Sequence, residues 1–595
     1  AVQIAKLRFF ISLVVDQTMN AGQENLGIRP LPNLETKFVA ANTLIGIDHP
    51  QQIMFRNPLI DEKEKRLAEV RSALFTARTP SAKRKYRALD QQLRTELTDL
   101  LKNDGWGSAT AAQLASWDPY NQNASAGFFD PEWMFGIVDG FDIVIGNPPY
   151  VSYGLRDTQS LVEGEKSQLR LLYPNSAEYK ISLYAIFMEK AIHLCKSSGF
   201  QIFIVPDSFL LGRYFSNIRK YILRTCEIQQ IVLLPFSVFE ATVGFSVIYL
   251  FKKELVISKD HKVNAKLANN KLDFSNTHLR SFSYHQSFWS TRIYNRFVLF
   301  FDEQTMQIVI KIESDADELG KFITLGSGLI SRIGQKTIIS STQINKEWLP
   351  GIISGGEITQ YTVQPRGYYI HYKKDLIKSG YENIDYFSNK LFIRQTGDSL
   401  ICAFDDKGLL ALNNVHIGNS TYGADTCKFI MALCNSKLMN FYYKSISLET
   451  GRAMAQTDIE TIEKLPIKTK PNKIKLEIIE LINAIIKNKG VNPSSNILSI
   501  KNEIDQLVYQ LYDLTEEEIA IVEGREILPE ENIVNPVNDE EETISTYIEE
   551  VDPPIIPPSD HSLYKCCLYD KLVNGFTKDE HAREIHPGKT IEWKK

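Results

Sequence analysis

The sequence predicts an α/β protein whose N-terminal half is built on an open, largely parallel sheet. Residues 141–146 form an apolar run rich in β-branched side chains, the pattern of a buried parallel strand. The run ends in glycine and continues as Asn-Pro-Pro-Tyr at 147–150, and helical and strand patterns then alternate up to residue 251. Open sheets carry their sites at the carboxyl ends of strands, so the 147–150 loop is the candidate site.

This loop combines rigidity with hydrogen-bond acceptors. Pro148 and Pro149 fix the backbone and bias the residues before them toward extended geometry. We expect the side-chain oxygen of Asn147 and the backbone oxygen of Pro148 to accept the two N–H donors of a primary amine. Tyr150 offers a flat face on which a planar ring can stack, at about 1–3 kcal/mol. A proline turn after a buried strand is the purely structural alternative.

The loop resembles that of the amino-group methyltransferases that use S-adenosylmethionine. The chain around it is similar to the TaqI-like, gamma-class DNA N6-adenine methyltransferases, including those fused to endonucleases in type IIG restriction–modification proteins. The resemblance implies a Rossmann-like methyltransferase sheet, S-adenosylmethionine as cofactor and double-stranded DNA as partner. It also implies a flipped adenine, with Asn147, Pro148 and Pro149 in the amine-activating motif and Tyr150 stacking on the base.

Composition bounds the class of protein. With 595 residues and 43% hydrophobic content, the chain can form several domains. A net charge of −5 and a pI near 6.2 exclude a uniformly basic nucleic-acid coat, so any DNA contact needs a local basic face. Seven cysteines without a CxxC pair or metal-ligand spacing predict a reducing compartment and no zinc site.

We expect a cytoplasmic protein, because the apolar runs are too short for a membrane span and no signal-peptide pattern is visible. The chain opens on a helical pattern at 1–14. In the family this helix follows the second strand, after a glycine-rich cofactor loop and an acidic ribose ligand that this sequence lacks. We therefore expect the carboxyl-terminal portion of a longer protein, with a nuclease domain upstream as one possibility. Circular permutation is the alternative.

Residues 33–45 predict a strand with a polar residue at its end. Asn42 matches the family position that contacts the adenine ring of the cofactor. A loop asparagine that satisfies backbone groups is an equally good interpretation. The next segment, about 56–103, predicts two antiparallel helices separated at Pro80, a hairpin inserted before the strand at 141–146.

Further strands and helices complete the predicted sheet. A helix over 179–191, a strand over 199–206 and a helix over 215–224 precede two strands, 228–234 and 245–251, that we expect to pair antiparallel. The resemblance matches this pair to the end of the methyltransferase sheet. Phe239, between the two strands, matches the aromatic that packs edge-to-face on the extruded adenine; a loop residue in the core is the alternative.

The carboxyl half differs in its sequence pattern: it contains short strand-like runs with many glycines and aromatic residues. It resembles the TaqI-like C-terminal specificity domain through Asn435–Tyr443 and Leu465–Ile467. Five basic residues supply local positive charge for phosphates: Lys373, Lys374, Lys378, Lys390 and Arg394. The predicted organisation is a methyltransferase domain (1–254), a linker (255–320), a mixed α+β target-recognition domain (321–470), C-terminal helices (471–530) and an acidic, proline-containing tail (531–595).

These observations leave three hypotheses. The first is an adenine-N6 DNA methyltransferase of a restriction–modification system. The second is a methyltransferase that acts on RNA or a protein amide, since other families share Asn-Pro-Pro-Tyr but lack a large recognition domain. The third is a DNA-binding specificity fragment without autonomous catalysis, because the cofactor loop is absent from the sequence.

Overall fold

The computed structural model describes residues 2–525 apart from 48–56, 105, 122, 154–161, 179–180, 240–243, 269, 271–278, 381, 383, 448–454 and 493–494. The chain divides into two units, 1–527 and 528–595. The second unit, which contains the predicted tail, lies outside the described residues. Within the described ranges, no helix is both long enough and apolar enough to cross a bilayer.

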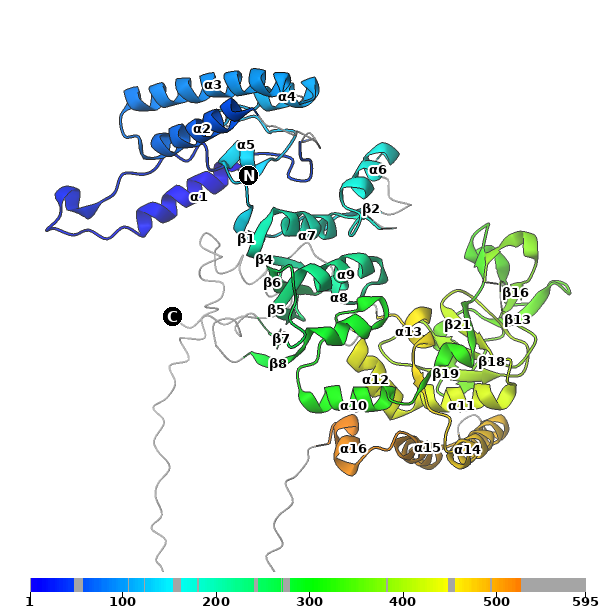
Figure 1. Ribbon diagram of the computed structural model, residues 1–595. Helices are drawn as coiled ribbons and strands as arrows, with labels where there is room; N and C mark the ends of the chain where they lie inside the picture. The colour runs from blue at the N-terminus through cyan, green and yellow to red at the C-terminus, as the bar shows by residue number, and fades with distance from the viewer. Residues whose placement is uncertain are drawn as a thin grey trace, which may run out of the picture. The chain divides into compact units, whose positions relative to one another are not determined.

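A mixed sheet forms the centre of the N-terminal half (Figure 1). Among the described residues its order is β1-β4-β6-β5-β7-β8. β1 pairs parallel with β4, whereas β6 is antiparallel to both β4 and β5, as predicted for the last strand pair. The bounds are β1 (Phe141–Gly146), β4 (Cys195–Pro206), β5 (Cys226–Leu234), β6 (Ser246–Lys253), β7 (Lys262–Leu267) and β8 (Arg280–His285).

The strands β7 and β8 lie in the region predicted as a linker, 255–320, and extend this sheet instead. Val263 and Ala265 on β7 are fully buried, while Asn264 between them is only partly buried. A short strand that buries only alternate side chains has too few apolar residues to stand out in a polar sequence. The domain boundaries themselves remain predictions.

One face of the sheet packs against α7 (Leu183–Leu194) and α9 (Ser216–Thr225) and forms a continuous apolar core. On β1, Val144 faces this core. Ile143 and Ile145 point to the opposite face, where they are 57% and 73% exposed. The prediction of a buried strand at 141–146 was therefore wrong for the face that carries Ile143 and Ile145.

Among the described residues, five α-helices and a short 3-10 helix (Glu24–Gly27) precede β1; Figure 1 shows the α-helices. The helices expected on either side of Pro80 are α2 and α3, which pack against each other, and each begins with a proline after a capping side chain, Asn57 or Thr79. The bounds are α1 (Val2–Val15), α2 (Pro58–Thr76), α3 (Pro80–Asn103), α4 (Ser108–Ser116) and α5 (Pro131–Phe135).

The strand predicted for 33–45 does not form. In this segment the structure has an isolated bridge between Ala41 and Ala126. The Asn33 side chain donates to the Leu74 and Ala77 backbone oxygens at 2.7 and 2.8 Å, at the end of α2. The segment therefore docks on a helix end, where Leu34 is buried, and Val39 and Ala41 pack partly buried against the helical core.

The carboxyl half of the described chain contains two larger sheets, in the orders β10-β21-β18-β19 and β12-β16-β13-β20. Helices α11, α12, α14 and α15 share a core with the first sheet. The strand bounds are β10 (Thr324–Ser327), β12 (Ile339–Ser340), β13 (Trp348–Ile352), β16 (Tyr369–His371), β18 (Lys390–Arg394), β19 (Cys402–Asp405), β20 (Leu410–Ala411) and β21 (Val415–Asn419). The helix bounds are α10 (Glu303–Glu313), α11 (Ala424–Asn435), α12 (Lys437–Ile446), α13 (Ile459–Glu463), α14 (Asn472–Val491), α15 (Leu498–Leu511) and α16 (Glu516–Glu523).

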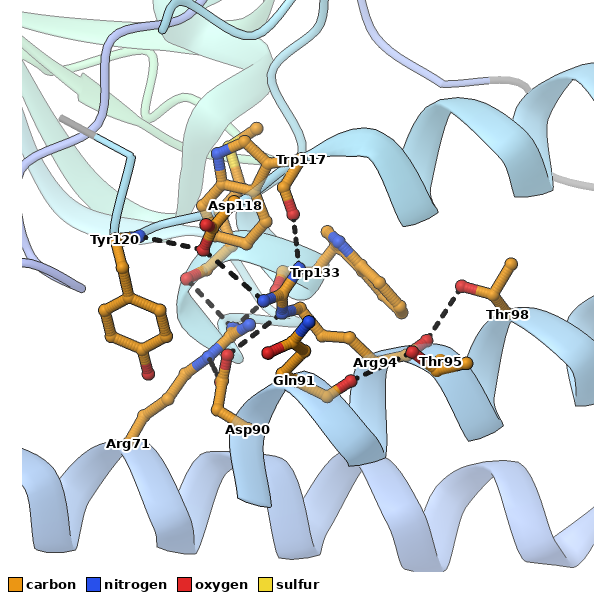
Figure 2. Close-up of polar contacts among 11 residues, drawn as sticks. Arg71, Asp90, Gln91, Arg94, Thr95, Thr98, Trp117, Asp118, Tyr120 and Trp133 are labelled. Atoms are coloured by element: carbon orange, nitrogen blue, oxygen red, sulfur yellow. Dashed lines mark hydrogen bonds and ion pairs between the residues drawn. The ribbon is translucent and has the colours of Figure 1, made fainter. Parts of the chain in front are cut away.

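A buried ion cluster holds the helices before β1 together (Figure 2). Asp90 on α3 is 0% exposed and accepts from Arg71 Nε at 2.8 Å and from Arg94 Nε at 3.0 Å. The two guanidinium groups also donate to the backbone oxygens of Trp133 and Trp117. One carboxylate therefore links α2 and α3 to the segments before and within α5.

We expect Asp90→Asn to lower the free energy of unfolding of this region by about 3–5 kcal/mol, because two buried guanidinium groups lose the charge of Asp90 and Arg94 keeps only its longer contact with Asp118. Guanidinium titration followed by tryptophan fluorescence measures the change, since Trp117 and Trp133 lie in the cluster. Asp99→Asn is the control: Asp99 forms an exposed ion pair with Lys102, and its loss should cost less than about 1 kcal/mol. Equal effects of the two substitutions would contradict the assigned role of Asp90.

Candidate active site

The Asn-Pro-Pro-Tyr loop leaves the carboxyl end of β1 beside β4. Gly146 pairs with Phe203, and a Cβ at this position would come within 3.3 Å of the Phe203 ring. Glycine therefore allows the close approach of the two strands just before the loop. Pro148 is buried, whereas Asn147 and Pro149 are exposed. The loop thus has a fixed centre and an exposed amide.

Tyr150 anchors the loop to the neighbouring strand. Its hydroxyl donates to the Ile204 backbone oxygen on β4 at 3.0 Å. The ring is half-buried and lies edge-on to Tyr184, with centroids 6.3 Å apart. Burial raises the pKa of Tyr150 to about 12, so the phenol stays neutral near pH 7. Tyr150 is suited to aromatic contact rather than to proton transfer.

The structure brings Phe239 next to Tyr150, although the two are far apart in the sequence. Phe239 lies in the connection from β5 to β6, and the centroids of the two rings are 6.1 Å apart at an interplanar angle of 73°. This is an edge-to-face contact.

Asn42 lies in a turn rather than at the end of a strand. Its Oδ1 accepts from the Leu44 N–H at 3.3 Å, and its own N–H donates to the Ala126 oxygen. The Leu44 side chain packs against the same apolar cluster as Tyr153 and Leu183. Tyr153 lies three residues after the candidate loop, and Leu183 is the first residue of α7. In the described part of the chain Nδ2 of Asn42 has no partner, so this group can donate to a ring nitrogen.

Sequence reasoning missed a series of side-chain contacts that leads from Tyr150 toward the carboxyl half. Tyr184 on α7 contacts the Tyr150 ring, and its hydroxyl lies 3.1 Å from that of Ser208, just after β4. Ser208 lines a cavity of about 500 Å³ together with side chains of the carboxyl half, among them Gln395 and His416. No sequence motif marks this cavity, because its walls come from segments more than 100 residues apart that meet only in the folded chain.

One of the basic residues predicted to meet phosphates is not available. Lys390 is fully buried and donates to Asp405 at 2.5 Å and to the Tyr386 backbone oxygen. β18 is buried on both faces from Lys390 to Ile393, so the lysine side chain lies inside the domain. The prediction of a phosphate contact was therefore wrong for Lys390.

Comparison with known proteins assigns the two halves. The model of the Eco57I restriction-modification methylase matches residues 1–239, and the model of the TaqI-like C-terminal specificity domain matches residues 351–467. Residues 1–239 therefore carry an Eco57I-type restriction-modification methylase domain, and residues 351–467 carry a TaqI-like C-terminal specificity domain. The candidate loop lies in the methylase match, and the far wall of the cavity lies largely in the specificity match.

Individual relatives of this methylase are distant. A putative type II restriction enzyme and methyltransferase of Methanocaldococcus jannaschii is 23% identical over 98% of this chain and 52% of that protein. A type II methyltransferase of Thermus thermophilus is 29% identical over 16% of this chain and 24% of that protein. The chain therefore spans about half the length of the archaeal relative. The structure of the type IIL restriction-modification enzyme MmeI in complex with DNA covers 78% of this chain and 76% of that one, at 13% identity and a TM-score of 0.40.

Proposed function

We propose that this methylase transfers a methyl group to the N6 amine of adenine in double-stranded DNA, as part of a cytoplasmic restriction–modification system, and that it takes the base out of the duplex to do so. The observation that carries the proposal is the geometry of the loop at 147–150. The exposed residue Asn147 directly follows a strand that pairs with β4, and Tyr150 at the end of the same loop contacts the Phe239 ring edge to face.

The proposed roles follow from the chemistry of the residues. The Asn147 Oδ1 and the Pro148 backbone oxygen accept the two N–H groups of the target amine and favour a tetrahedral nitrogen, which makes its lone pair available. Tyr150 stacks on the base while its hydroxyl stays bonded to Ile204, and Phe239 packs on the base edge. These contacts offset part of the few kcal/mol that extrusion of a base costs.

S-adenosylmethionine would supply an electrophilic methyl group at this site. Asn42 fits a contact to its adenine ring, because the unpartnered Nδ2 can donate to a ring nitrogen. The glycine-rich loop and acidic residue expected for such a site are not in this sequence. For this reason the second candidate, a DNA-specificity fragment without catalysis of its own, stays open. Calorimetry of the chain with S-adenosylmethionine separates the two candidates: absence of binding favours the fragment.

We expect Asn147→Ala to lower methyl incorporation into DNA by at least about 100-fold, because the amine loses one of its two acceptors. Duplex affinity should change less than about twofold, since the amide does not touch phosphate. Transfer of labelled methyl and fluorescence anisotropy measure the two quantities, with Asn103→Ala, an exposed asparagine at the end of α3, as control. Nucleoside analysis of the product must give N6-methyladenine; N4-methylcytosine would refute the base assignment.

We expect Tyr150→Ala to abolish the fluorescence increase of 2-aminopurine placed at the target position, because the extruded base loses its stacking surface, worth about 1–3 kcal/mol. Tyr150→Phe is the matched control. It keeps the ring and removes only the hydrogen bond to Ile204, so it should retain the signal while stability falls by about 1 kcal/mol. An unchanged signal in Tyr150→Ala would contradict the stacking role.

A further inference from the structure

The cavity of about 500 Å³ described above has an unexpected charge pattern for a surface that meets DNA. Its walls join the loop after β4, with Ser208 and Arg213, to the carboxyl half, with Thr457, Asp458 and Glu460. Carboxylates repel phosphates, so acidic groups in such a cavity need another explanation. The arginines of the cavity supply one, because each lies next to one of these carboxylates.

Arg213 and Glu460 form an ion pair across the cavity. Arg213 belongs to the short helix after the loop that follows β4, and Glu460 lies in the first turn of α13. A second, longer contact joins Arg296 Nη2 to Asp458 Oδ1 at 3.9 Å. Arg213 lies within the methylase match, Arg296 follows β8 of the same six-stranded sheet, and both carboxylates come from the start of α13. The same short helix therefore faces both cations.

The two arginines differ in how firmly they are held. Arg296 is buried and donates to the Thr461 hydroxyl at 2.6 Å, so it forms part of the packing. The Arg213 side chain is 46% exposed, and its guanidinium lies over the Tyr214 ring at 4.7 Å. An exposed ion pair contributes little to stability, so a competing anion can replace Glu460 at small cost. Arg213 is already oriented by the aromatic ring behind it.

The position of Arg213 connects the replacement of Glu460 by an anion to the candidate active site. Its loop begins at Ser208, whose hydroxyl lies next to that of Tyr184, and Tyr184 contacts Tyr150. In the cavity wall His416 and Arg296 also keep buried nitrogen atoms, Nδ1 and Nε, without a partner among the described residues. The wall thus contains polar groups that the protein does not satisfy by itself.

We propose that Arg213 binds a DNA backbone phosphate in this cavity and that Glu460 occupies its guanidinium when DNA is absent. The proposal rests on the proposed function, because it requires duplex DNA as the partner. A planar guanidinium fits a phosphate with two parallel hydrogen bonds, which a single carboxylate contact does not exceed. The ion pair then acts as an electrostatic latch between the methylase side and the specificity side, and a phosphate opens it.

Binding of a random-sequence duplex of about 30 base pairs to the purified full-length protein tests the latch, since phosphate contacts dominate non-specific binding. Arg213→Ala should weaken binding about tenfold and reduce the slope of log K against log salt by about one. Glu460→Gln should instead tighten binding about two- to fivefold, because the competing carboxylate is gone. The control is Arg66→Ala, which removes an exposed arginine paired with a glutamate on α2 and should change neither quantity.

The double variant Arg213→Ala/Glu460→Gln separates the latch from simple repulsion. If Glu460 acts through Arg213, the gain from Glu460→Gln disappears in the Arg213→Ala background. Persistence of the full gain, or Arg213→Ala binding like Arg66→Ala, would overturn the latch while leaving the proposed methyltransferase intact. Failure of the unaltered protein to bind any duplex would overturn both proposals.

Discussion

The parallel pairing of β1 with β4 is the constraint on which the candidate site depends. Gly146 lets the strands approach where a larger residue would meet the Phe203 ring, and the Tyr150 hydroxyl closes the loop onto Ile204 four residues later. Between these two points Pro148 is buried and Asn147 is exposed. The loop is therefore fixed at both ends by the same neighbouring strand, which positions the backbone that carries Asn147.

The same strand also connects the site to the carboxyl half. After its last residue, Pro206, β4 continues into the loop that carries Ser208 and Arg213. Arg219 on α9 fixes this loop by donating to the Phe209 and Gly212 backbone oxygens at 2.6 and 2.8 Å. Burial lowers the pKa of Arg219 to about 9, yet it remains cationic at neutral pH. A single strand thus positions both the aromatic anchor and the wall of the cavity.

Local patterns in the sequence predicted most regular elements of the methylase half. The antiparallel pairing of β5 with β6 followed from two apolar runs close together in the sequence, and the helices on either side of Pro80 followed from their apolar stripes. Segments whose neighbours are distant in sequence were harder. Residues 33–45 docked on α2 rather than in a sheet, and β7 joined the sheet with only alternate apolar residues.

The residues of the candidate site also divide into those that a local sequence pattern reveals and those that depend on contacts distant in sequence. Asn147 to Tyr150 are contiguous, so a motif revealed them. The resemblance matched Phe239 to an aromatic that packs on the adenine; its ring contact with Tyr150 was not predicted and is found only in the structure. Tyr184, Ser208 and Arg213 carry no motif and are recognisable only through their contacts. Lys390 shows the opposite error: a lysine in a polar stretch suggested a surface cation, whereas its partner Asp405 lies on the adjacent strand and buries it.

The open side of β1 has a practical consequence for handling this chain. Within the described residues, β1 pairs with one neighbour, and its Ile143 and Ile145 side chains face outward. A strand with one unpaired edge and isoleucines on its exposed face is a template for addition of a strand from another molecule. Preparations of the chain by itself are therefore expected to self-associate as their concentration rises, and dilute samples with moderate salt suit solution measurements better than concentrated ones.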